Sequence, residues 1–162
     1  MRRVKSCGVI LFKDAPTCSF LVMKHNTRFD LPKGHIEKGE SEVECALREL
    51  YEETSISRDL VLLEPEFRSE TVYYPHDHQL NGEKVEKTVV IFLGHLKQDV
   101  PVIPIEHSGY EWVTWDPPHR FNHGTIDRVL IKVAQFVEEG ACPSGYYMPG
   151  LAKKIKRGSA GL

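Results

Sequence analysis

The segment from Gly34 to Ile56 constrains the fold more than any other part of the chain, because it reads as a glycine-containing loop followed by a short amphipathic helix. A helix turns about 100° per residue, so spacings of three and four residues bring Glu49, Glu52 and Glu53 onto one face. The opposite stripe is apolar and should face the core; it consists of Val43, Ala46, Leu47 and Leu50. The pattern predicts a helix that is acidic on one side and buried on the other.

The start of this helix is marked by a capping box. Ser41 and Glu44 have the spacing at which serine and glutamate side chains cap each other's backbone amides, so the helix should begin just after Glu40. The Glu40 carboxylate is then either part of a ligand shell or an acid favoured by the positive end of the helix dipole.

Three carboxylates on one helix face repel each other unless a cation lies among them. Hard divalent cations such as Mg²⁺ prefer oxygen ligands and commonly bridge protein carboxylates to substrate phosphates. Each glutamate alone would be ordinary solvated surface, and Arg48 alone a surface ion-pair partner of little energetic value. Together with Gly34 and Glu40 at fixed spacing, the cluster predicts a metal site.

This spacing resembles the Nudix box, a pattern of glycine, glutamate, Arg-Glu, Glu-Glu and a final glycine at fixed intervals. The corresponding positions in this chain are Gly34, Glu40, Arg48, Glu49, Leu50, Glu52, Glu53, Ser55 and Ile56. Only Ser55 departs from the pattern, because the family has glycine there, where a left-handed turn should follow the helix. A serine in that turn would cost about 1 kcal/mol, which concerns the turn and not the ligands.

The resemblance implies a metal-dependent hydrolase of nucleoside diphosphates that are linked to another group. It implies Mg²⁺, or Mn²⁺ in its place, as the cofactor. The implied metal ligands are Gly34, Glu49, Glu52 and Glu53. The metal would acidify a bound water, whose proton either Glu53 or Glu106 would accept. Arg48 would hold the ligand carboxylates in place.

Composition and charge agree with a single-domain enzyme. The chain has 162 residues, of which 41% are hydrophobic, and this suits one domain with a real core. Its net charge of −2 provides no general attraction to nucleic acid or anionic membranes, so any phosphate recognition must be local. The partner that the resemblance implies is a small nucleotide. No apolar stretch is long enough to span a bilayer, and none near the N-terminus suits a secretory signal, which makes the cytoplasm the expected location. The oligomeric state does not follow from these residues.

The four cysteines are Cys7, Cys18, Cys45 and Cys142. They lack the paired spacing of a metal site. Cys7 lies in an apolar strand pattern and Cys45 on the predicted helix, so both should be buried, neutral thiols.

Hydrophobic periodicity predicts a sheet and a second helix. Strands are expected at 7–12, 20–23, 87–93 and 111–115, with at least one more between 61 and 74, and a helix at 125–138. These elements predict an α/β fold, a mixed sheet sandwiched between helices, which the Nudix resemblance also implies.

The chain should form one domain, from residue 1 to 140, followed by a tail from 141 to 162. The tail contains glycines, prolines and a basic cluster, and we expect it to be flexible and solvated. The alternatives are a weak phosphate or nucleic-acid contact through the basic cluster and docking of Tyr146 and Tyr147 on the domain.

Three features outside the box resemble the asymmetrical diadenosine tetraphosphate hydrolases of the Nudix superfamily. They are Pro32-Lys33-Gly34-His35, the segment from Glu106 to Trp112, and Tyr73 followed by a variable loop and Lys87-Thr88-Val89-Val90. The substrate contacts implied by the resemblance are Lys33, His35, Tyr73, His107 and Tyr110. Lys33 would neutralise a phosphate oxygen, and the faces of Tyr73 and Tyr110 suit adenine stacking.

Several of these residues also have a structural alternative. Tyr73, Tyr110 and Trp112 are aromatic residues in or near strands, where core packing is common, and the core is the expected place for Trp112. His107 is either a structural hydrogen-bonding histidine or a phosphate contact. The loop from 75 to 87 lies where an insertion can reshape substrate choice.

The expected reaction is attack on diadenosine tetraphosphate that gives ATP and AMP. Rival substrates are nucleoside triphosphates, ADP-ribose, diphosphoinositol phosphates and RNA 5′ ends. An enzyme for either of the last two should have a denser basic surface near its active site. A different class is a catalytically silent Nudix-fold sensor that binds a nucleotide, although the complete set of box acids favours an enzyme.

Overall fold

A computed structural model describes residues 1–77 and 81–144 of the chain, and all structural statements concern these residues. The strands are β1 (Arg2–Lys13), β2 (Ser19–His25), β3 (Arg28–Asp30), β4 (Lys33–His35), β5 (Val61–Leu63), β6 (Ser69–Tyr73), β7 (His76–Asp77), β8 (Glu83–Leu96) and β9 (Gly109–Thr114). The helices are α1 (Glu42–Thr54), a 3-10 turn η1 (Arg58–Leu60), and α2 (Gly124–Phe136).

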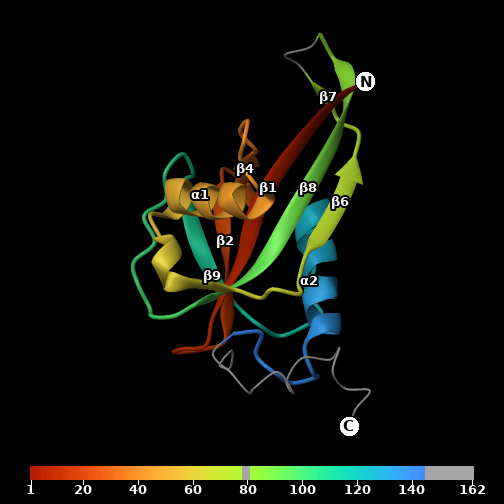
Figure 1. Ribbon diagram of the computed structural model, residues 1–162. Coiled ribbons are helices and arrows are strands. Elements are labelled where there is room, and N and C mark those ends of the chain that lie inside the picture. Colours follow the sequence, from red (N-terminus) through yellow and green to blue (C-terminus); the bar gives the residue numbers. More distant parts are fainter. Residues whose placement is uncertain (78–80, 145–162) are drawn as a thin grey trace.

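The centre of the sheet is a long parallel pair formed by β1 and β8. They run side by side from the pair Arg2–Val85 to the pair Phe12–His95, and the order across the sheet is β3-β2-β1-β8-β5. β4 pairs with β1, β6 and β7 pair with β8, and β9 pairs with β2, all antiparallel. The start of β1 and the hairpin of β7 and β8 extend beyond the rest of the sheet (Figure 1).

The two helices cover opposite faces of the sheet. Successive side chains of a strand point to opposite faces, and in β1 Val9 and Leu11 belong to the core that includes Leu50 of α1. Their neighbour Ile10 belongs to the second core, with Val129 of α2. Because both faces are covered, the middle of β1 is buried without interruption. The predicted mixed sheet between helices is confirmed.

Helix α1 has the predicted ends. The hydroxyl of Ser41 accepts from the amide of Glu44, whose side chain accepts from the amide of Ser41. At the other end Ser55 has φ 65°, the left-handed conformation expected at the position where the family has glycine. The capping box and the left-handed turn are therefore both present.

The other predicted elements are present, most of them longer than expected. The strand predicted at 87–93 extends over Glu83–Leu96, and the one predicted at 7–12 over Arg2–Lys13. The extended region between 61 and 74 contains β5 and β6, and the helix predicted at 125–138 is α2. None of the described helices is long and apolar enough to cross a membrane.

The cysteines were only partly foreseen. Cys7 and Cys45 are buried free thiols, as predicted. Cys18, just before β2, forms a disulfide with Cys142, which follows α2, across a sequence separation of 124 residues. Nothing in the local sequence indicates this pair, because only the return of the chain after α2 brings the two cysteines together.

Ordered packing continues past residue 140, where the tail was expected to begin. The hydroxyl of Ser144 donates to the backbone oxygen of Phe12 at 3.0 Å, and Ser144 is buried. The remainder of the predicted tail, including Tyr146, Tyr147 and the basic cluster, lies outside the described residues.

Candidate active site

The acidic face of α1 lies against the short strand β4. The backbone amide of Lys33 donates to Oε2 of Glu53 at 3.0 Å. A Cβ atom at Gly34 would lie 2.1–2.4 Å from the carboxyl atoms of Glu49, so this approach requires a residue without a side chain. One helical turn therefore brings Glu49 and Glu53 to neighbouring residues of one strand.

Arg48 joins the loop and the helix around these carboxylates. It donates to Glu40 at 2.5 Å, to Glu49 at 2.9 Å, to Glu52 at 3.1 Å and to the backbone oxygen of His35 at 3.0 Å. The hydrogen bonds from Arg48 lower the pKa of Glu40 to about 2, so this pair stays ionised. Arg48 thus occupies the position that the predicted role in holding the carboxylates requires.

Glu53 is a buried carboxyl group among other negative charges. Its burial raises its pKa to about 8, opposed by the Lys33 amide and reinforced by the charges of Glu49 and Asp30. The Nε2 atom of His107 lies 3.5 Å from its Oε1 atom. Any additional positive charge that enters the site would therefore stabilise the ionised form of Glu53.

The chemistry of this cluster fits a hard divalent cation. Glu49, Glu52 and Glu53 supply carboxylate oxygens, and the charge of Lys33 only partly offsets the burial and the like charges that disfavour the ionised form of Glu53. Glu52 is half exposed and bound to Arg48, and the Gly34 carbonyl accepts from the Cys45 thiol. Within residues 1–77 and 81–144, no three His, Cys, Asp or Glu side chains are grouped closely enough to form a metal cage.

Two lysines lie near Asp30, a residue whose charge also acts on Glu53. The Nζ atom of Lys33 forms an ion pair with Oδ2 of Asp30 at 3.0 Å. Lys87 of β8 is half buried, and its burial and the charge of Lys33 lower its pKa. Neither Asp30 nor Lys87 was predicted as a site residue, although a lysine directly before an apolar strand core is a usable signal.

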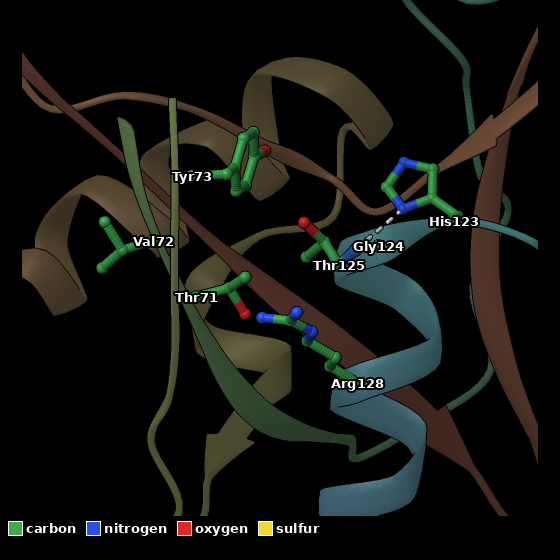
Figure 2. Close-up of a pocket in the computed structure, with 7 residues that line it drawn as sticks. All are labelled: Thr71, Val72, Tyr73, His123, Gly124, Thr125 and Arg128. Atoms are coloured by element: carbon green, nitrogen blue, oxygen red, sulfur yellow. Dashed lines mark hydrogen bonds between the residues drawn. The ribbon is translucent and has the colours of Figure 1, made fainter. Parts of the chain in front are cut away.

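Two cavities adjoin this region. The first, the β6–α2 cavity, has a volume of about 360 Å³ and is lined by Thr71, Val72, Tyr73, His123, Gly124, Thr125 and Arg128 (Figure 2). The second, the β3 cavity, has a volume of about 270 Å³ and is lined by His25, Arg28, Phe29, Asp30, Glu106, His107 and His123. His123 lines both cavities, so they lie next to each other at this residue.

His123 was not singled out from the sequence. Its Nδ1 atom accepts from the amides of Thr125 and Ile126, so it caps the start of α2. With Nδ1 acting as acceptor, the neutral ring carries its proton on Nε2, which lies 3.9 Å from Oδ1 of Asp30. A histidine directly before a helical pattern indicates a helix cap. The position of His123 between the two cavities follows only from the fold.

Two of the predicted substrate residues line the cavities. His107 lines the β3 cavity and Tyr73 the β6–α2 cavity, and the candidate base Glu106 also lines the β3 cavity. His35 is exposed, and Tyr110, which is 39% exposed, lines neither cavity. Trp112 packs against the core on the α1 side, as expected.

Comparisons with known proteins agree with this fold and with the box. The family described as "NUDIX domain" matches residues 2–133. The chain is 32% identical over 125 residues to the asymmetrical bis(5'-nucleosyl)-tetraphosphatase of Rattus norvegicus, covering 70% of this chain and 80% of the relative. The corresponding Caenorhabditis elegans protein is 25% identical over 143 residues, which cover 85% and 90%. A solved structure of a C. elegans Ap4A hydrolase binary complex has a TM-score of 0.70 at 22% identity, covering 82% of this chain and 96% of that one.

Proposed function

The chain belongs to the NUDIX family of hydrolases, and within that family we propose that it cleaves diadenosine tetraphosphate asymmetrically into ATP and AMP. The relatives that are about 30% identical are asymmetrical tetraphosphatases. Their substrate is carried over to this chain as a proposal.

The observation that carries the proposal is a pair of cavities that share His123, one of which contains His107, the neighbour of Glu53. A dinucleoside tetraphosphate has two bases joined by a long anionic chain. The β6–α2 cavity and the β3 cavity share His123, and Lys33 and Lys87 are cations close to that junction. Two compartments suit a two-ended substrate better than a single nucleoside triphosphate.

In the proposed reaction the phosphate chain lies over Lys33 and Lys87, whose ammonium groups offset its charge. When bound, Mg²⁺ or Mn²⁺ would neutralise phosphate oxygens and acidify a water molecule; Glu49, Glu52, Glu53 and the Gly34 carbonyl would hold it. Arg48 keeps Glu49 and Glu52 oriented through shared hydrogen bonds.

The proton of the attacking water goes to Glu53 or Glu106. Glu53 is buried beside β4 and has a pKa near the working range of a general base. Glu106 lines the β3 cavity with φ 66°, a conformation that costs a non-glycine residue energy and recurs at functional sites. Glu106→Gln separates them, because Glu53 is also a proposed metal ligand: loss of the base at Glu106 lowers kcat by two or more orders of magnitude, whereas a small change in kcat assigns the base to Glu53.

The test is chromatography of the products formed from diadenosine tetraphosphate with Mg²⁺, with and without chelator. We expect ATP and AMP, and no product with chelator. Glu52→Gln should abolish turnover while the protein stays folded, because it removes one carboxylate charge with little change in volume. Glu83→Gln on the β7–β8 hairpin is the matched control and should retain activity.

Other outcomes redirect the proposal. Two molecules of ADP would contradict the point of attack. No product would direct the assay to nucleoside triphosphates, ADP-ribose, diphosphoinositol phosphates and RNA 5′ ends. Nucleotide binding without any turnover would identify a catalytically silent sensor.

We also propose the cytoplasm as the place of this activity. The disulfide between Cys18 and Cys142 opposes this location, because reducing compartments keep most thiols reduced. Cell fractionation followed by alkylation of free thiols tests both points, and a cytoplasmic protein with all four thiols free would agree with the proposal.

A further inference from the structure

The β6–α2 cavity combines an aromatic ring with a free guanidinium group. Tyr73 of β6 and His123 at the start of α2 contribute rings, and Arg128, one turn into α2, extends toward Thr71 on the facing strand (Figure 2). A volume of about 360 Å³ is sufficient for a purine base. The ring of Tyr73 provides a face on which any base can stack.

Within the part of the chain that the structure describes, Arg128 has no partner. Its side chain is exposed, and it makes no hydrogen bond or ion pair with any other residue of the described ranges. A guanidinium group carries five N–H donors and no acceptor. An arginine with all of its donors free, directed into a cavity, is available to a ligand.

The lining of this cavity supplies more donors than acceptors. The Nδ1 atom of His123 is used by the helix cap, so its Nε2 atom is a donor. None of the seven lining residues is acidic. The side chains that offer acceptors are the hydroxyl groups of the two threonines and the tyrosine.

This donor excess distinguishes the two purines. Guanine presents two acceptors, O6 and N7, on one edge, and a guanidinium group binds both at once. Adenine presents N7 next to the N6 amino group, which is a donor and would face the donors of Arg128. We propose that Arg128 binds the O6 and N7 atoms of a guanine stacked on Tyr73, so that the enzyme prefers guanine-containing dinucleoside tetraphosphates.

The position of the cavity allows this base to belong to the substrate of the active site. Tyr73 is the register partner of Lys87, the half-buried lysine near Lys33. His123 connects the cavity to the β3 cavity, whose residue His107 lies beside Glu53. A base bound at Arg128 therefore sends its phosphates toward the acids of α1. The inference rests on the proposed function and adds the identity of the base.

The experiment compares hydrolysis of diguanosine and diadenosine tetraphosphates. A bidentate contact is worth about 1–3 kcal/mol, so we expect kcat/KM to be roughly tenfold higher for the guanine substrate. In Arg128→Ala the two substrates should have about equal kcat/KM. Arg128→Gln should reverse it, because an amide side chain binds the N6 and N7 atoms of adenine. Arg58→Gln, on η1, is the matched control and should keep the wild-type ratio.

Binding without turnover separates this inference from the proposed function. Calorimetry with GDP and ADP in the presence of chelator measures base preference directly, and we expect tighter binding of GDP that Arg128→Gln reverses. Tighter GDP binding without tetraphosphate hydrolysis would support the inference and reject the proposed function. Hydrolysis of both tetraphosphates with equal kcat/KM would support the proposed function and reject the inference. If Arg128→Gln weakens both nucleotides equally, the arginine contacts phosphate and the inference is wrong; failure of both nucleotides to bind would also overturn it.

Discussion

At the scale of single residues, Glu53 is the group whose state depends most on its surroundings. It is 7% exposed, it faces the charges of Glu49 and Asp30, and the Nε2 atom of His107 lies 3.5 Å from its Oε1 atom. Desolvation and like charges both favour the protonated form. The carboxyl group that the sequence presents as a metal ligand is therefore also the one that most needs a cation.

The first prediction concerns the pH dependence of the metal-free protein. The pKa of Glu53 is about 8 in the folded state against a reference of 4.5, so the folded state binds the proton more tightly than the unfolded state. The contribution of Glu53 to the free energy of unfolding is therefore lost as pH rises from about 4.5 to 8. The free energy of unfolding, measured with urea at each pH, should decline across this range in the wild type, and Glu53→Gln should remove the decline.

The same residue can be observed directly. In the NMR spectrum of metal-free protein labelled at glutamate carboxyl carbons, one resonance should titrate near 8 and vanish in Glu53→Gln. Mg²⁺ should shift this titration to lower pH. A Glu53 resonance that titrates near 4.5 would contradict the account of its burial.

The second prediction concerns Gly34. In Gly34→Ala the three atoms nearest to the new Cβ all belong to the end of the Glu49 side chain, at 2.1–2.4 Å, so that side chain must move. Because the displaced group is flexible, we expect a small change in thermal stability and a loss of turnover of tenfold or more. Gly109→Ala is the control, since its Cβ would meet nothing within 4 Å. Wild-type turnover in Gly34→Ala would show that the position of Glu49 is unimportant.

At the scale of secondary-structure elements, α1 combines one favourable end with one strained end. Ser41 and Glu44 satisfy amides at its start. Ser55 at its end has φ 65°, which is unfavourable for a residue with a Cβ atom, although its amide still donates to Tyr51. The helix therefore starts from a stabilising motif and ends in a turn that glycine would adopt more readily.

The third prediction follows from this turn. Ser55→Gly should raise the free energy of unfolding by about 1 kcal/mol, because the left-handed conformation carries no Cβ penalty in glycine. Chemical denaturation measures the change. Ser57→Gly is the matched control: Ser57 has φ −68° and caps η1 through the amide of Asp59, so this change should destabilise the protein. Equal effects of the two substitutions would contradict the explanation.

At the scale of the whole molecule, the Cys18–Cys142 disulfide cross-links segments that lie far apart in the sequence. The bond joins the residue before β2 to the segment after α2, at a sequence separation of 124. Ser144 reinforces the junction by donating to the backbone of Phe12. A cross-link over most of the chain restricts the unfolded state strongly.

The fourth prediction tests this closure. Cys142→Ser should lower the free energy of unfolding by several kcal/mol, on the order of 4 for so long a loop. Reductant should have a similar effect on the wild type and no further effect on Cys142→Ser. Thermal unfolding with and without reductant measures both. A wild type that is insensitive to reductant would mean that the disulfide does not form.

Much of this fold could be predicted from local patterns because its elements obey short-range rules. The cap at Ser41 and the turn at Ser55 depend on neighbouring residues and appear where they were expected. Of the predicted apolar stripe of α1, Ala46, Leu47 and Leu50 are buried in the core, but Val43 is 39% exposed, so the prediction was wrong for that residue in the first turn of the helix. The strands β1 and β8 were recognised from their apolar cores, but their full lengths were not. Their polar ends are ordered by pairing with each other, as in Arg2 with Val85, which no local pattern encodes.

The sequence by itself determined the box and the chemistry that its carboxylates can perform, since helical spacing alone places Glu49, Glu52 and Glu53 on one face. Tertiary structure alone decided what surrounds them. It buried Glu53 against β4, brought Lys87 toward Lys33, placed His123 between two cavities and joined Cys18 to Cys142. The physical reason is range: periodicity acts over a few residues, whereas burial and electrostatic coupling depend on segments that meet only in the folded chain.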